Sequence, residues 1–153
     1  MKYLIYGLQR SGTNFLEEIL NKKYNIQVSN EKNRKSILHK HFRLYSEKNK
    51  IPIPEYINNK YYESFIDLYD TIKKRINYYF KIIIIKKDIF SWLISIYKWS
   101  IKCNWNIKNK NIFLNDYYLF YKKWKQYSEN NPDKILLITY IDLLNNDKLL
   151  IKQ

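Results

Sequence analysis

Residues 3–16, YLIYGLQRSGTNFL, combine a short apolar run, a polar loop and the start of a helical pattern. The apolar run ends at Gly7, and Thr13 begins the helical pattern. A strand that passes through a glycine-bearing loop into a helix brings backbone N–H groups and the positive end of the helix dipole to one place. We therefore expect this strand–loop–helix unit to bind an anion, such as a phosphate, at the N-terminus of the helix.

The loop starts like a Walker A motif and then departs from it. Gly7 and Gly12 have the spacing of that motif, but Thr13 and Asn14 stand where a lysine and a Ser/Thr are required. The lysine that would reach the β- and γ-phosphates of ATP is therefore missing, and Arg10 lies inside the loop instead. This pattern predicts a phosphate loop for a ligand other than ATP.

The same loop also supplies side-chain donors. Ser11, Thr13 and Asn14 can hydrogen-bond a phosphate, and Arg10 adds a fixed positive charge. An ordinary strand-to-helix turn is the alternative, because such turns use glycine for positive φ and Thr or Asn as helix caps. The loop pattern by itself leaves both interpretations open.

Strand and helix patterns alternate along the chain. The clearest strand is 79–85, YFKIIII, which is apolar on both faces as a central parallel strand should be. This alternation predicts one α/β domain over residues 1–153, with a mainly parallel central sheet flanked by helices. The other predicted strands are 2–6, 25–28, 36–39 and 135–140; the predicted helices are 13–22, 62–77, 89–101, 114–127 and a short one from Ile141; the predicted loops are 46–59 and 104–111, with a turn at 132–133.

Composition narrows the class of protein. Cys103 is the single cysteine, which excludes an intramolecular disulfide and fits a reducing compartment. No secretory signal pattern is visible, and the longest aliphatic run, 82–85, is too short to span a bilayer. We expect a cytoplasmic protein without a transmembrane segment.

The formal charge of +14 favours acidic partners such as nucleotides, nucleic acid, glycans or membrane surfaces. A lysine-rich, glycine-poor composition is equally typical of AT-rich coding sequence, so charge alone selects no partner.

Two histidines end the predicted strand 36–39. Ligands of parallel sheets bind beyond the carboxyl ends of the strands, where the segments 7–14, 39–41 and 86–95 should meet. His39 and His41 could together hold a metal, but no cysteine pair, third histidine or nearby carboxylate completes such a site, and we predict no metal. Either histidine could serve as a general base, or both could lie on a basic surface loop.

Lys87 and Ser95 form a second candidate pair for phosphate. Lys87 precedes the predicted helix 89–101, and Ser95 lies almost two turns inside it. A cation and a hydroxyl so placed could bind one phosphate, or the serine could bond back to its own helix backbone.

Taken together, these segments resemble the sulfotransferase family, which transfers a sulfuryl group from 3′-phosphoadenosine 5′-phosphosulfate (PAPS). Residues 10–16, RSGTNFL, fit at every position the family's 5′-phosphosulfate loop, [KR]-S-G-T-[TN]-[WFL]-L. Residues 87–97, KDIFSWLISIY, match the 3′-phosphate motif R-[DN]-P-x-[DE]-x-x-x-S-x-Y in serine and tyrosine spacing. The Lys40-His41 pair and residues 139–143, TYIDL, are similar to two further family motifs, the second usually [RT]-Y-E-D-L.

The resemblance implies a three-layer P-loop-like fold and PAPS as co-substrate, without a metal. By this resemblance Arg10 stabilises charge on the oxygen that bridges phosphate and sulfate. His41 accepts the proton of an acceptor hydroxyl or amine, with His39 in reserve. The resemblance also implies the other cofactor-binding residues. Ser11, Gly12, Thr13 and Asn14 belong to the 5′-phosphosulfate loop, Phe15 packs near the adenine, and Lys87 with Ser95 binds the 3′-phosphate.

The chain also departs from the family pattern. Lys87 replaces the usual arginine and keeps its charge without its bidentate geometry. Ile89 replaces the usual proline, and few residues follow the last predicted strand, so the resemblance is to a minimal or C-terminally short member. The acceptor is unidentified, and a carbohydrate is one candidate class.

Two other functions compete with this one. A P-loop nucleotide kinase would need the missing lysine and a Mg²⁺-binding carboxylate, for which Asp88 is the candidate. A non-enzymatic module for nucleic acid or another polyanion would use the positive charge and the many aromatic residues. We do not expect nucleic acid as the partner, because the tyrosines and tryptophans fit core positions.

Overall fold

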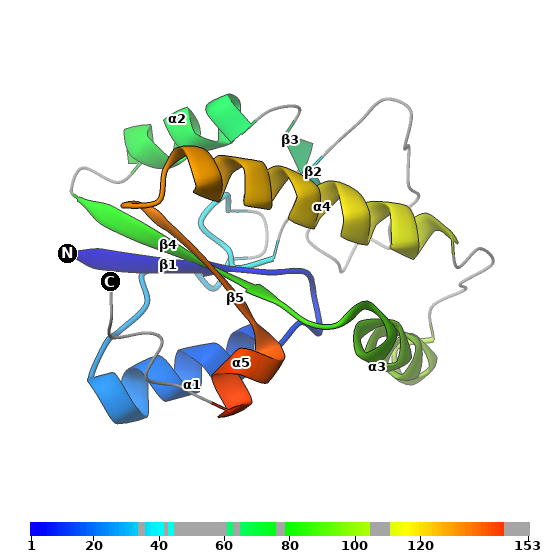
Figure 1. The fold of residues 1–153 in the computed structure, drawn as a ribbon. Helices are drawn as coiled ribbons and strands as arrows, with labels where there is room; N and C mark the ends of the chain where they lie inside the picture. Colours follow the sequence, from blue (N-terminus) through cyan, green and yellow to red (C-terminus); the bar gives the residue numbers. More distant parts are fainter. Residues whose placement is uncertain are drawn as a thin grey trace.

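Three parallel strands form the central sheet, in the order β1-β4-β5 (Figure 1). The computed structural model describes residues 1–33, 36–41, 43–44, 61–62, 65–75, 79–104 and 111–145. The sheet consists of β1 (Lys2–Tyr6), β4 (Phe80–Lys86) and β5 (Ile135–Thr139). The predicted α/β class with a parallel sheet is therefore confirmed. Its central strand is β4, whose run of isoleucines is buried on both faces as predicted.

Helices cover both faces of this sheet. Figure 1 shows α1 (Thr13–Tyr24) and α5 (Tyr140–Asn145) on one face, and α2 (Phe65–Arg75) and α4 (Asn111–Asn130) on the other. α3 (Ile89–Lys102) lies beyond the carboxyl end of the sheet. Among the described residues no helix combines the length and apolar character needed to cross a bilayer.

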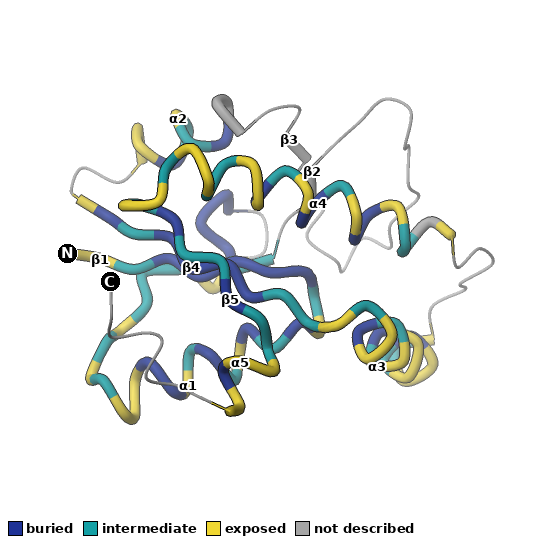
Figure 2. The backbone as a smooth tube through the Cα atoms, viewed as in Figure 1, coloured by how far each residue is buried: buried dark blue, intermediate teal, exposed yellow. Residues whose placement is uncertain are grey.

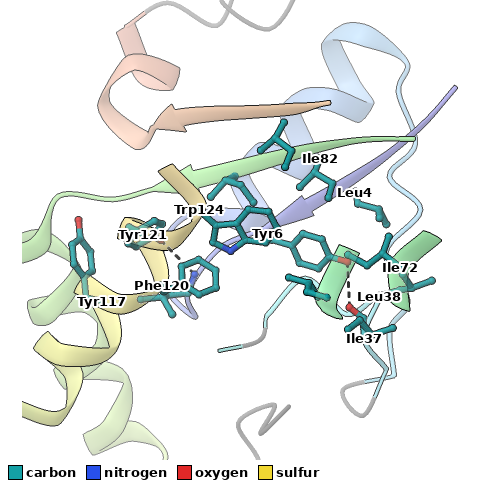
Figure 3. Close-up of a cluster of buried hydrophobic side chains, with 14 of the residues drawn as sticks. Leu4, Tyr6, Ile37, Leu38, Ile72, Ile82, Tyr117, Phe120, Tyr121 and Trp124 are labelled. Atoms are coloured by element: carbon teal, nitrogen blue, oxygen red, sulfur yellow. Dashed lines mark hydrogen bonds between the residues drawn. The ribbon is translucent and has the colours of Figure 1, made fainter. Parts of the chain in front are cut away.

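Alternate strand residues point to opposite faces and build two cores. Leu4, Tyr6 and Ile82 face α4, where the Tyr6 ring stacks on Trp124 at 6.0 Å between centroids (Figure 3). Ile5 and its neighbours in the sheet face α1 and α5 instead. That second core contains Ile5, Leu16, Ile19, Leu20, Ile83, Ile85, Ile138 and Leu143. Figure 2 shows these buried positions gathered along the strands and the inner sides of the helices.

The segment after α1 follows the outer edge of β1 without forming the strands we predicted. Of 25–28, only Val28 pairs with β1, through a single bridge to Tyr3. The prediction of a strand at 36–39 is wrong, because these residues form a turn in which the Ser36 hydroxyl accepts the Leu38 N–H at 3.1 Å. A serine hydroxyl that binds the local backbone in this way competes with strand pairing.

Other boundaries differ from the predictions by a few residues. β4 begins at Phe80, α4 begins at Asn111 within the predicted loop 104–111, and α5 begins at Tyr140. β5 ends at Thr139 because the Thr139 hydroxyl accepts the Asp142 N–H at 3.1 Å and so starts the helix.

Of the predicted helix 62–77, α2 covers the part from Phe65 to Arg75. Position 62 instead belongs to β3 (Tyr61–Tyr62), which pairs in parallel with β2 (Arg43–Leu44). The predicted loop 46–59 lies outside the described residues.

Candidate functional site

A cavity of about 490 Å³ lies at the carboxyl end of the parallel strands. Its volume is within the range of small-molecule sites. Every predicted site residue except Ser11 lines it, and none of the described residues in its wall carries a carboxylate. The lining residues are Gln9, Arg10, Gly12, Thr13, Asn14, Phe15, His39, Lys40, His41, Lys87, Ser95, Trp99 and Tyr140.

The N-terminus of α1 opens into this cavity without a cap of its own. Gly12 is the N-cap residue and has no side chain with which to cap the helix, and the first turn holds no acidic residue. The first backbone bond of the helix runs from Leu16 N–H to the Gly12 carbonyl at 3.0 Å. The N–H groups of Thr13, Asn14 and Phe15 therefore have no acceptor within the helix. Three donors and the helix dipole together favour an anion at this point.

Both glycines of the chain lie in this loop, and neither leaves room for a side chain. Gly12 has a φ of 103°, and a Cβ there would lie 2.5 Å from Cδ2 of Tyr140. A Cβ on Gly7 would meet the Ser11 hydroxyl and lie 3.0 Å from the Ile85 carbonyl oxygen. The loop is thus packed closely against both β4 and the start of α5.

Ser11 is the predicted site residue that the structure does not bring to the cavity. The side chain is fully buried and does not line the cavity. Its backbone N–H donates to the Leu8 carbonyl at 3.0 Å. Ser11 therefore supports the loop from inside.

Arg10 connects the loop to α3. Its backbone has a φ of 71°, and its Nε donates to the Ser95 hydroxyl at 3.4 Å. The guanidinium carbon lies 4.8 Å from the centre of the Trp99 ring, a cation–π contact. Arg10 and Ser95, 85 residues apart in sequence, therefore share one wall of the cavity.

Lys87 and two aromatic rings form another part of the wall. The Lys87 Nζ lies 5.3 Å from the centre of the Tyr140 ring, and that ring lies 5.7 Å from the ring of Phe15. Because Lys87 follows β4 directly while Phe15 is in the first turn of α1, Tyr140 links the two strand-to-helix junctions.

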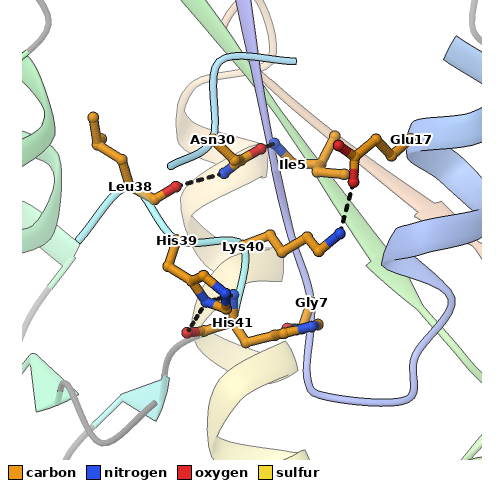
Figure 4. Close-up of polar contacts among 8 residues, drawn as sticks. All are labelled: Ile5, Gly7, Glu17, Asn30, Leu38, His39, Lys40 and His41. Atoms are coloured by element: carbon orange, nitrogen blue, oxygen red, sulfur yellow. Dashed lines mark hydrogen bonds and ion pairs between the residues drawn. The ribbon is translucent and has the colours of Figure 1, made fainter. Parts of the chain in front are cut away.

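The histidine segment is tied to the β1 loop through Gly7 (Figure 4). The Gly7 N–H donates to the Lys40 carbonyl at 3.2 Å, and His41 Nδ1 lies 3.2 Å from the Gly7 carbonyl. A carbonyl only accepts hydrogen bonds, so Nδ1 of His41 carries the proton and the basic lone pair of the neutral ring is on Nε2. The Lys40 Nζ forms an ion pair with Glu17 of α1 at 2.6 Å.

His39 orients His41. Its side chain is buried, and its Nδ1 accepts the backbone N–H of His41 at 3.2 Å. The two rings lie 5.4 Å apart, edge to face. Among the described residues no group of three His, Cys, Asp or Glu side chains is placed to hold a metal ion.

Tyrosines of α4 hold both strand ends in place. The Tyr121 hydroxyl donates to the Ile85 carbonyl at 2.9 Å and accepts the Leu8 N–H at 3.4 Å. The Tyr117 hydroxyl donates to the Lys87 carbonyl at 2.6 Å, and burial, with a smaller effect of Asp88, raises the pKa of Tyr117 to about 12. Burial also raises the pKa of Tyr121, so both phenols stay protonated and bind the backbone at neutral pH.

Asp88 does not reach the cavity. Its carboxylate accepts the Ser91 N–H at 2.9 Å and so caps α3, and that hydrogen bond lowers the pKa of Asp88. It lines a separate cavity of about 350 Å³ on the side of Tyr117 and Tyr118.

Gln9, Trp99 and Tyr140 line the cavity although the sequence did not single them out as site residues. The spacing of Trp99 was informative, because it follows Ser95 by one helical turn and so lies on the same face of α3. Tyr140 occurs in the segment 139–143 that resembles a family motif, but nothing in the sequence places its ring against Gly12.

Comparisons with known proteins identify no relative: no protein-family model, no curated protein and no solved structure matches the chain. The function is therefore inferred from the residues and geometry of the cavity.

Proposed function

We propose that the protein is a sulfotransferase on a P-loop-like fold, with PAPS as the sulfuryl donor and a hydroxyl or amine as the acceptor. The observation that carries the proposal is the single cavity that joins the open N-terminus of α1, Lys87 with Ser95, and His41. These three parts come from three separate segments of the chain, and each has the chemistry that a bisphosphorylated sulfuryl donor requires.

The charges in the cavity suit this donor. Arg10, Lys87 and Lys40, the last paired with Glu17, line it, and in the part of the chain that the structure describes no carboxylate lines it. The N–H groups of Thr13, Asn14 and Phe15 would bind the 5′-phosphate, because a helix N-terminus favours negative charge. Lys87 would bind the 3′-phosphate with Ser95, and that second phosphate distinguishes PAPS from ATP.

The transfer step needs positioning, a base and stabilisation of the leaving group. The acceptor oxygen or nitrogen forms a bond to sulfur while the bond from sulfur to the phosphate oxygen breaks. The acceptor proton passes to Nε2 of His41, whose Nδ1–H is held by the Gly7 carbonyl. Arg10 and the N-terminus of α1 offset the charge that develops on the departing 3′,5′-adenosine bisphosphate.

Nucleotide binding tests the donor assignment. Calorimetric titration should show much tighter binding of 3′,5′-adenosine bisphosphate than of 5′-AMP, and Lys87→Ala should remove most of that difference. Lys86→Ala is the matched control, because Lys86 carries the same charge but lies over the rings of Tyr117 and Tyr121. Equal affinity of the native protein for both nucleotides would contradict the proposal.

The same titration separates the competing functions. A nucleotide kinase would bind ATP in a Mg²⁺-dependent way, yet Asp88, its candidate metal ligand, is engaged in capping α3. A polyanion-binding module would bind single-stranded DNA in a salt-sensitive way without preferring the bisphosphate nucleotide.

A further inference from the structure

α3 carries an apolar stripe on its outer side. Its four large side chains are at least half exposed: Phe90 by 73%, Ile94 by 58%, Tyr97 by 50% and Ile101 by 65%. Their spacing of four, three and four residues places them on one face of the helix. Exposed apolar residues are common singly, but a continuous row marks an interaction surface.

The stripe is a different face from the one that packs on the protein. Trp92 and Ile96 hold the helix to the core, and Ser95 and Trp99 line the cavity. In Figure 2 the buried positions of α3 face the body of the protein and exposed positions face away from it.

The charges around the stripe favour an anionic partner. α3 itself contains no acidic residue, although its N-cap is Asp88, and its two lysines, Lys98 and Lys102, are exposed, with the Lys102 Nζ 5.6 Å from the centre of the Trp99 ring. The whole chain carries a formal charge of +14. A second copy would bring the same charge, and a stable protein interface needs about 20–30 residues on each side, far more than this stripe supplies.

We propose that α3 docks on an anionic lipid surface, with the apolar stripe in the interface and Lys98 and Lys102 against the headgroups. Interfacial helices bind through this combination of inserted apolar side chains and basic residues beside them. The proposal does not rest on the sulfotransferase assignment.

Co-sedimentation of the full chain with vesicles tests the docking. We expect binding to vesicles of phosphatidylserine and phosphatidylcholine, weakened by salt, and little binding to phosphatidylcholine alone. The double variant Phe90→Ser, Ile94→Ser should bind at least about tenfold more weakly, because two large apolar side chains no longer enter the interface. The double variant Lys98→Gln, Lys102→Gln should lose about tenfold or more, through the headgroup contacts.

Ile141→Ser is the matched control, because Ile141 has the same exposed fraction as Ile94, 58%, but belongs to α5. This variant should bind the vesicles like the native chain. The proposal is overturned if the native chain ignores anionic vesicles, or if the stripe variant binds them undiminished. It is also overturned if sedimentation velocity reveals a dimer that the stripe variant loses, because a second copy then covers the stripe. Melting temperatures of all variants confirm that each is folded.

Discussion

The two strand-to-helix junctions at the carboxyl end of the sheet differ in how the N-terminus of the helix is capped. After β1 the chain makes a six-residue loop, 7–12, and enters α1 through Gly12, which has no side chain to cap the helix. After β4 it enters α3 within two residues, and the Asp88 carboxylate caps the helix by accepting the Ser91 N–H.

This difference shows how a side-chain cap decides whether the N-terminus of a helix can bind an external anion. A carboxylate at the N-terminus of α3 satisfies the donors that an external anion would use there. At α1 the corresponding donors stay open to the cavity. Backbone N–H groups can therefore meet a ligand at the N-terminus of α1, whereas the capped junction contributes side chains to the cavity, Lys87 before α3 and Ser95 within it.

The largest effect is expected from His41, which is anchored to the first junction at Gly7. His41→Ala should lower the transfer rate about 10²- to 10⁴-fold, the contribution of a general base, with the affinity for 3′,5′-adenosine bisphosphate unchanged. A radiolabelled sulfuryl-transfer assay over an acceptor panel measures the rate. His39→Ala should cost less, because His39 acts by orienting His41. Full activity in both variants would place the base elsewhere.

Gly12→Ala should disrupt the open junction. An alanine at a φ of 103° is strained, and its Cβ would displace the Tyr140 ring, so the free energy of unfolding should fall by about 2–4 kcal/mol. Binding of the bisphosphate nucleotide should fall with it, as Tyr140 and the N-terminus of α1 move. Urea denaturation and calorimetry measure the two effects. An equal loss of nucleotide binding in Asp88→Ala, at the capped junction, would contradict a special role for the open N-terminus of α1.

Tyr121→Phe should loosen both junctions at once. It removes the hydroxyl shared by the Ile85 carbonyl and the Leu8 N–H, and leaving these buried groups unsatisfied should cost about 1–3 kcal/mol of unfolding free energy. Urea denaturation at neutral pH measures the loss. An unchanged stability would mean that α4 does not hold the strand ends through this residue.

The smallest effect should come from the capped junction. Asp88→Ala should lower Tm by about 2–4 °C, through loss of the α3 cap. The folded protein holds the pKa of Asp88 below its ordinary value of 3.8, mainly through the Ser91 N–H. The stability that the ionised Asp88 carboxylate adds is therefore complete above pH 3.8, and it is lost as pH falls through the lower pKa of the folded state.

Melting temperatures measured from neutral to acid pH should show this loss of stability. Asp88→Asn is the control, because an asparagine caps a helix without titrating. The melting temperatures of this variant and of the native protein should differ only in the acid range. The same difference at every pH would show that the charge of Asp88 is not what titrates.

Local patterns predicted much of this molecule. Hydrophobic periodicity predicted the strands 2–6 and 79–85. Together with the glycine loop after the first strand, it also predicted the helix that begins at Thr13. The turn at 36–39 did not follow, because the Ser36 hydroxyl competes with pairing in a way that periodicity does not report. Tyr140 was missed as part of the site for another reason, since its contacts with Gly12, Phe15 and Lys87 join three distant segments.

The sequence by itself determined the parallel α/β class, the glycine loop between the first strand and the first helix, and the residue types that line the cavity. These properties are encoded locally, in strand and helix periods and in the spacing of glycine, arginine and hydroxyl side chains. Only the tertiary structure decided that Ser11 faces inward and that Asp88 serves as a cap. It also decided that Arg10 meets Ser95 and Trp99, and that His41 donates to Gly7. Those outcomes depend on which distant groups the packed helices bring within hydrogen-bond distance, and a linear pattern does not contain that information.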